Sequence, residues 1–160
     1  MKPMLVTTGL LALALAAAAD PAAAQLADRK ALTLEGAKRM MAAAEAEARA
    51  NSWNVAIAIV DQAGDLLMFQ RFDEAPLANI EIALAKARTA VRLRQPTKRL
   101  EGNVAGGRTT LLAIEGAMPL EGGVPILVDG RVIGAVGVSG VASANDARIA
   151  QAGIDALVVR

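Results

Sequence analysis

The stretch between Ile82 and Leu100 holds six cations and no carboxylate, which makes it the part of the chain best suited to bind an anion. Arg88 and Arg92 are four residues apart, so on a helix they are neighbours and repel each other by a few tenths of a kcal/mol. Substrate carboxylates, haem propionates or acidic residues of a second subunit would relieve that repulsion. Charge runs also form ordinary solvated faces, so both interpretations stay open. The six cations are Lys86, Arg88, Arg92, Arg94, Lys98 and Arg99.

A second candidate anion contact follows Gly106 and Gly107, where Arg108 and Thr109 lie in a glycine-rich segment. The chain contains no His, Cys or Tyr. It therefore lacks the usual zinc, copper and iron ligands, the Ser-His-Asp and Cys-His nucleophile systems, and tyrosine acid–base chemistry. We predict no metal site from the sequence. Catalysis would have to use carboxylates, lysine, arginine, hydroxyls or backbone amides.

The glycine-rich segment 122–140 predicts a β-hairpin rather than a phosphate-binding loop, because no lysine follows a glycine pair. Asp129-Gly130 is the preferred two-residue type I′ turn, and it pairs Val128 with Arg131, Leu127 with Val132 and Ile126 with Ile133. Gly134 and Gly137 have opposite parity, so each face of the second strand has one place without a side chain. Such glycines permit close approach of a helix, another subunit or a flat ligand.

These candidate residues require a scaffold, and hydrophobic periodicity indicates one. We predict helices over 34–50 (N-cap Thr33), over 78–93, and from the capping region 143–146 to about 157. The predicted strands are 55–60, 66–72, 124–128 and 131–138. Segment 101–121 reads as an ordered covering loop or short helix. Two hairpins with three helices make an α+β domain with an antiparallel sheet. The predicted inner faces are Leu34, Ala37, Met41, Ala44 and Ala48; Ile80, Leu84, Ala87 and Val91; and Ile149, Ala152 and Ala156.

The first 24 residues have the pattern of a cleavable signal peptide. A cationic start precedes an apolar run over 4–19, which is shorter than the roughly 20 residues of a membrane span. Small residues at Ala22 and Ala24 predict cleavage before Gln25. The remaining single domain, 25–160, would be periplasmic or secreted and would have no stable membrane insertion. Its net charge of +1 favours no nucleic acid as a partner.

Five segments together resemble the GlcG/HbpS-like family, which includes the C-terminal domain of PduO. They are LTLEGAKRMMAAAEAEA, VAIAIVDQAGDLLMFQR, IEIALAKARTA, GGVPILVDGRVIGAVGVSG and NDARIAQAGIDAL. The resemblance implies a profilin-like fold, homo-oligomers and, for some members, binding of haem or a related tetrapyrrole. This chain departs from members that hold haem through histidine, which leaves Thr, Lys or Met as iron ligands. Val141 and Ala142 stand where relatives commonly place glycine and a small polar residue.

We therefore expect an exported, oligomeric protein that binds a small anionic ligand, with haem the leading single ligand. In this hypothesis Lys86, Arg88 and Arg92 meet the anionic group, and the glycine strand and segment 102–116 form a close wall. A second hypothesis is an enzyme that acts on a small organic acid by proton transfer, with Lys86 as base or electrostatic stabiliser. A third is an assembly protein whose basic helix meets an acidic surface of its neighbour.

Overall fold

The computed structural model describes residues 27–157, so the predicted signal peptide lies outside the described residues. Four strands form one antiparallel sheet in the order β2-β1-β4-β3. The two predicted hairpins are β1 (Ala56–Asp61) with β2 (Leu66–Arg71), and β3 (Gly123–Val128) with β4 (Arg131–Ser139). Strands β1 and β4 join the hairpins in the centre of the sheet. The predicted α+β class is confirmed.

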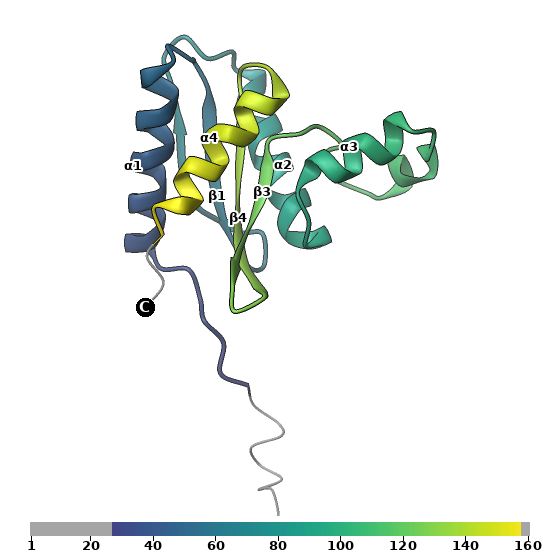
Figure 1. Ribbon diagram of the computed structural model, residues 1–160, viewed down its shortest axis with the longest axis horizontal. Helices are drawn as coiled ribbons and strands as arrows, with labels where there is room; N and C mark the ends of the chain where they lie inside the picture. Colours follow the sequence, from purple (N-terminus) through teal and green to yellow (C-terminus); the bar gives the residue numbers. More distant parts are fainter. Residues whose placement is uncertain (1–26, 158–160) are drawn as a thin grey trace, which may run out of the picture.

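Helices cover both faces of this sheet (Figure 1). α1 (Leu34–Ala50) and α4 (Ser143–Asp155) pack side by side on one face, and α2 (Ala78–Leu93) lies alone on the other. The first two helices have the predicted bounds. Thr33 caps α1 by accepting a hydrogen bond from the Gly36 backbone N–H at 3.1 Å. Among residues 27–157, no helix has the length and apolarity that a membrane span requires.

Residues 97–121 form an arm that projects from the body of the molecule (Figure 1). It contains α3 (Thr97–Ala105) and the 3₁₀ helix η1 (Thr109–Ala113), which pack mainly on each other. The predicted helical content is therefore present, but the arm does not cover the sheet. Two hydrogen bonds hold its base: Met118 N–H donates to Thr89 Oγ1 at 2.8 Å, and Gly123 N–H donates to Thr97 Oγ1 at 2.9 Å.

The two faces of the sheet have different packing. Large side chains such as Met40, Ile57 and Ile149 fill the α1/α4 side, whereas alanines dominate the α2 side. A Cβ added at Gly137 would collide with the backbone of α2 at Ala83 and Ala87. The absence of a side chain there lets the helix backbone lie directly on the strand. Gly134 faces the other side, as its predicted parity requires.

Three local predictions are wrong. In the β3–β4 hairpin, Ile126 pairs with Gly134 rather than Ile133, because a bulge follows Ile126. Ser52, with φ 57°, rather than Asn51, is the left-handed residue after α1. Leu34 is 54% exposed. Local sequence patterns do not indicate where a strand has a bulge or how the ends of a helix are arranged.

The inner faces of α2 and α4 are also rotated relative to the predictions. In α2 the predicted Ala87 and Val91 are buried, but Ala83 and Lys86 are buried in place of Ile80 and Leu84, which are half-buried. α4 buries Ala150 and Gly153 in place of the predicted alanines, which are half-buried. Small residues face the partner elements because helix and sheet, or helix and helix, approach closely there. Hydrophobicity alone predicts that the larger apolar residues take these positions.

Candidate functional site

Lys86, the central residue of the predicted site, lies inside the protein. Its side chain is 3% exposed, and Nζ lies 2.8 Å from Oδ2 of Asp146, whose side chain is 2% exposed. Nζ also donates a hydrogen bond to the Val138 carbonyl oxygen at 3.0 Å. Lys86 was predicted to meet the anionic group of a ligand, but its anionic partner in the structure is a carboxylate of the same chain, 60 residues further on.

Asp146 connects this ion pair to the start of α4. Its other oxygen, Oδ1, accepts a hydrogen bond from the Val141 backbone N–H at 3.2 Å. Ala142, the N-cap of α4, contributes no side-chain hydrogen bond, so Asp146 supplies the negative charge that the helix N-terminus favours. Burial raises the pKa of Asp146, and the hydrogen bond and charge of Lys86 oppose that rise. An anionic ligand would have to compete with the Asp146 carboxylate for the ammonium group of Lys86.

The glycine pair at the start of β3 makes room for this ion pair. A Cβ on Gly122 would lie 2.8 Å from Lys86 Nζ and 2.9 Å from Asp146 Cβ, and one on Gly123 would overlap the Lys86 backbone. Contact between Lys86 and a ligand therefore stays a prediction, and it would require the ion pair to open. The same holds for a role of Lys86 as a base.

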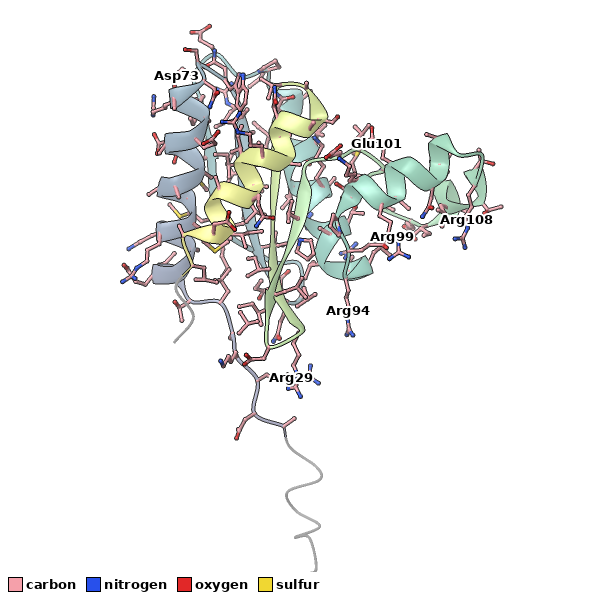
Figure 2. The ribbon with its side chains drawn as sticks, viewed as in Figure 1. Arg29, Asp73, Arg94, Arg99, Glu101 and Arg108 are labelled. Atoms are coloured by element: carbon pink, nitrogen blue, oxygen red, sulfur yellow. The ribbon has the colours of Figure 1, made fainter. Side chains whose placement is uncertain are left out.

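The other predicted contacts do not gather around Lys86. Arg88 Nε donates to the Gly64 carbonyl oxygen at 3.1 Å, and Arg92 is exposed on the next turn. Arg108 lies at the far end of the arm with Thr109 beside it (Figure 2). Gly134 and Gly137 lie within the body, covered by other parts of this chain. Their roles as ligand contacts stay predictions.

A groove of about 960 Å³ lies elsewhere, between the N-terminal segment and the tip of the β3–β4 hairpin. Apolar residues of the hairpin and cationic side chains both line it. The lining residues are Ala27, Asp28, Arg29, Lys30, Gln62, Arg94, Leu127, Val128, Asp129, Gly130, Arg131, Val132 and Ile133. Figure 2 shows Arg29 beside the hairpin tip, and Arg94 on the side of the hairpin from which the arm projects. Lys30 is paired with Asp129 at 2.9 Å.

Arg94 has an uncommon backbone conformation in this groove. It ends α2 in the left-handed region, with φ 53° and ψ 37°. Glycine is the usual residue in that conformation, which costs another L-residue roughly 1–2 kcal/mol. Arg94 is exposed, so packing of its side chain does not explain its presence. A strained, exposed arginine in the wall of a groove points to a role in binding.

Sequence reasoning assigned no ligand contact to this groove. Arg94 belongs to the cationic stretch, but Arg29 and Arg131 lie far from it in sequence. The predicted turn at Asp129-Gly130 already places Arg131 at the tip of the hairpin, so this residue could have been found from the sequence. The path of residues 27–30 past the turn depends on tertiary structure and has no local sequence signal.

Acidic side chains and methionines are the remaining side chains that could ligate a metal ion in a chain without histidine or cysteine. Within the part of the chain that the structure describes, no three side chains of the His, Cys, Asp and Glu types come together. Met40 and Met41 are buried in the core, and Met68 packs against it. Met118, at the base of the arm, is half-buried. None of the four lines the groove.

Known proteins resemble this chain over most of its length. Residues 32–155 match the family model described as haem degrading protein HbpS-like. Protein GlcG of Escherichia coli K12 is 46% identical over 109 residues, which are 68% of this chain and 81% of GlcG.

Two solved structures have the same fold. A double mutant of HbpS from Streptomyces reticuli has a TM-score of 0.78 at 33% identity, covering 92% of this chain and 99% of that one. A PduOC:heme complex has a TM-score of 0.73 at 30% identity, covering 79% and 95%. The sequence resemblance is thus confirmed over nearly all of the described residues, and the chain belongs to the HbpS-like family.

Proposed function

We propose that this protein binds a carboxylated tetrapyrrole, with haem the leading example, in the groove at the tip of the β3–β4 hairpin. The observation that carries the proposal is the combination of apolar and cationic side chains in the lining of the groove. Leu127 and Val132 present apolar surface to the groove, and Arg94 and Arg131 border it. A tetrapyrrole has the matching chemistry: a flat apolar ring and, at one edge, propionates that arginines bind well.

The groove fits the ring and its propionates better than it fits the iron. No histidine, cysteine or tyrosine occurs anywhere in the chain, and no methionine lines the groove. Lys30 is the candidate iron ligand that the groove offers, and it is held by Asp129. Recognition would therefore depend on the ring face and the propionates. The family and the haem complex of a relative support the same class of ligand.

Titrations with three porphyrins test this proposal. Haemin and metal-free protoporphyrin IX should both give saturable binding, with dissociation constants within about tenfold of each other because no strong axial ligand distinguishes them. Protoporphyrin dimethyl ester, which lacks free carboxylates, should bind more weakly. Absence of saturable binding for all three would disprove the proposed function. Binding of haemin alone would show that iron ligation, rather than the propionates, decides recognition.

A matched pair of variants tests the location. Arg94→Gln removes one charged contact and should weaken binding of protoporphyrin by roughly 10- to 150-fold, since a charged hydrogen bond contributes about 1.5–3 kcal/mol. Arg39→Gln is the control, because Arg39 is an exposed arginine of α1 whose nearest ionic partner is Glu35. Equal affinity in the two variants would place the ligand outside the groove.

We also propose that the protein works after export, with residues 1–24 removed. The cationic start, the apolar run and the small residues before Gln25 support this. Expression of the full chain in a Gram-negative host, followed by N-terminal sequencing of the periplasmic protein, should give Gln25 as the first residue. Recovery of uncleaved protein in the cytoplasm would contradict export.

A further inference from the structure

Two arginines of α2 lie beside loops from two other parts of the chain. Arg88 is half-buried, and its Nε donates a hydrogen bond to the Gly64 carbonyl oxygen, in the turn between β1 and β2, at 3.1 Å. Arg92 is exposed one helical turn further on. A Cβ built on Gly64 would lie 3.9 Å from Arg92 Nε, and one built on Gly116 of the arm would lie 3.6 Å from Arg92 Nη1. The guanidinium group of Arg92 therefore lies between the turn and the arm. We refer to Arg88 and Arg92 as the arginine pair.

No carboxylate of the described chain neutralises the arginine pair. Within residues 27–157, neither Arg88 nor Arg92 forms an ion pair. Asp65 and Glu115 are the acidic residues next to the two glycines in the sequence, and both are exposed and make no ion pair with these arginines. Like charges four residues apart on a helix repel each other. The pair therefore has a positive charge that the described residues leave without a partner.

The neighbours of the arginine pair leave room for a ligand. Gly64 and Gly116 have no side chains that could cover the two guanidinium groups. Arg88 uses Nε on the turn, which fixes the direction of its guanidinium group and leaves both Nη groups for another acceptor. A side chain that is already held in place loses less rotamer freedom when a ligand binds.

We propose that Arg88 and Arg92 bind a small oxyanion with two negative charges, either a phosphate group or a short dicarboxylate. The planar fork of N–H groups in arginine matches the spacing of oxygen atoms in both groups and binds them through paired hydrogen bonds. Two guanidinium groups side by side favour a dianion over a monoanion, because each positive charge then has a negative partner. Such an anion would lie between the body of the protein and the arm.

This site is separate from the groove proposed for a tetrapyrrole. Neither Arg88 nor Arg92 is among the residues that line the groove, whereas Arg94 is. Lys86, on the sheet side of the same helix, is enclosed with Asp146 and takes no part. The inference therefore goes beyond the proposed function, because it concerns a different ligand and different residues.

Calorimetric titration at constant ionic strength in chloride tests the ligand class. Above neutral pH, phosphate and malonate are both mostly dianions, and at least one of them should bind saturably with a dissociation constant of about 1 mM or lower. Acetate, a monoanion, should bind at least about tenfold more weakly. Tighter binding of phosphate would assign the site to phosphate groups, and tighter binding of malonate would assign it to dicarboxylates. No saturable binding of either dianion, or equal affinity for acetate, would overturn the proposal.

A matched pair of variants tests the location. Arg92→Gln should weaken binding of the tighter dianion by roughly 10- to 150-fold, the range expected for one charge-assisted hydrogen bond. Arg99→Gln is the control, because Arg99 is an exposed arginine of the same cationic stretch that lies on the arm (Figure 2). It should bind the dianion like the wild type. Equal losses in the two variants would show a general effect of net charge and would overturn the site.

Thermal unfolding separates a binding role of Arg92 from a structural one. In chloride alone, Arg92→Gln should unfold at the same temperature as the wild type or slightly higher, because the repulsion with Arg88 is relieved. The dianion should raise the Tm of the wild type and of Arg99→Gln, but not that of Arg92→Gln. A Tm that is lowered in chloride and still rises with the dianion would contradict a role in binding.

Arginine modification locates the anion without any substitution. Phenylglyoxal reacts with accessible guanidinium groups, and mass spectrometry of peptides identifies the modified residues. The dianion should slow modification of Arg88 and Arg92 and leave Arg99 and Arg108 unchanged. Equal protection of all four arginines, or of none, would overturn the proposal. Because none of these measurements includes a porphyrin, their failure would leave the proposed function untouched.

Discussion

Lys86 and Arg94 lie in the same cationic stretch, yet the structure uses them in opposite ways. Lys86 is on the sheet side of α2, where its ammonium is enclosed with Asp146 and the Val138 carbonyl. Arg94 ends the same helix in a left-handed conformation and lines an open groove. A buried cation needs a partner within the protein, whereas an exposed one is available to a ligand. Position in the fold, rather than charge, therefore separates a structural cation from one that is available to a ligand.

The largest expected effect comes from breaking the buried pair. Lys86→Met leaves the Asp146 carboxylate without its partner and should reduce the free energy of unfolding by about 3–5 kcal/mol. Replacing Asp146 by Leu in the same chain should recover much of that loss, because no unpaired charge remains. Urea denaturation measures both variants. If Lys86→Met has the same free energy of unfolding as the exposed control Lys38→Met, the Lys86–Asp146 pair does not stabilise the fold.

Packing of α2 on the sheet should give the next largest effect. Gly137→Ala places a methyl group against the α2 backbone and should cost about 1–3 kcal/mol of stability. Gly102→Ala is the matched change at an exposed helical site, where a Cβ meets nothing within 4 Å. It should stabilise the protein by up to about 1 kcal/mol. Thermal unfolding of the pair should therefore shift in opposite directions, and similar shifts would contradict close packing.

The loss caused by Lys86→Met should depend on pH. The lysine lowers the pKa of Asp146, so its removal lets burial raise that pKa further. A raised folded-state pKa means that the folded chain holds the proton more strongly than the unfolded chain, and stability then falls as the pH rises through this range. The variant should thus approach wild-type stability in acid. Denaturation curves from neutral to acidic pH measure the difference, and a pH-independent loss would contradict this linkage.

The smallest effect on stability is expected at Arg94. Arg94→Gly relieves the left-handed strain at the end of α2 and should raise the free energy of unfolding by about 1 kcal/mol. The same change removes a charge from the groove and should weaken porphyrin binding. Stability and affinity would then move in opposite directions at one residue. Unchanged affinity for porphyrin would show that Arg94 does not contact the ligand. Its left-handed conformation would then have no role in binding.

Most of the fold was predictable from local patterns. The bounds of α1 and α2, the type of turn at Asp129-Gly130 and the opposite orientation of Gly134 and Gly137 follow from helical period, strand parity and turn chemistry. The bulge after Ile126 and the half-buried positions of Ile80 and Leu84 do not. The burial of Ile80 and Leu84 depends on how closely α2 approaches the sheet, which in turn depends on residues far apart in sequence.

The candidate site was less predictable than the scaffold. The sequence by itself determined the α+β framework, the absence of histidine, cysteine and tyrosine ligands, and the cationic stretch, because these are properties of composition and local spacing. Only the tertiary structure decided that Lys86 has an internal partner and that Arg94 shares a groove with the hairpin tip. A charge is recognisable in sequence, but its partner is set by contacts between distant residues.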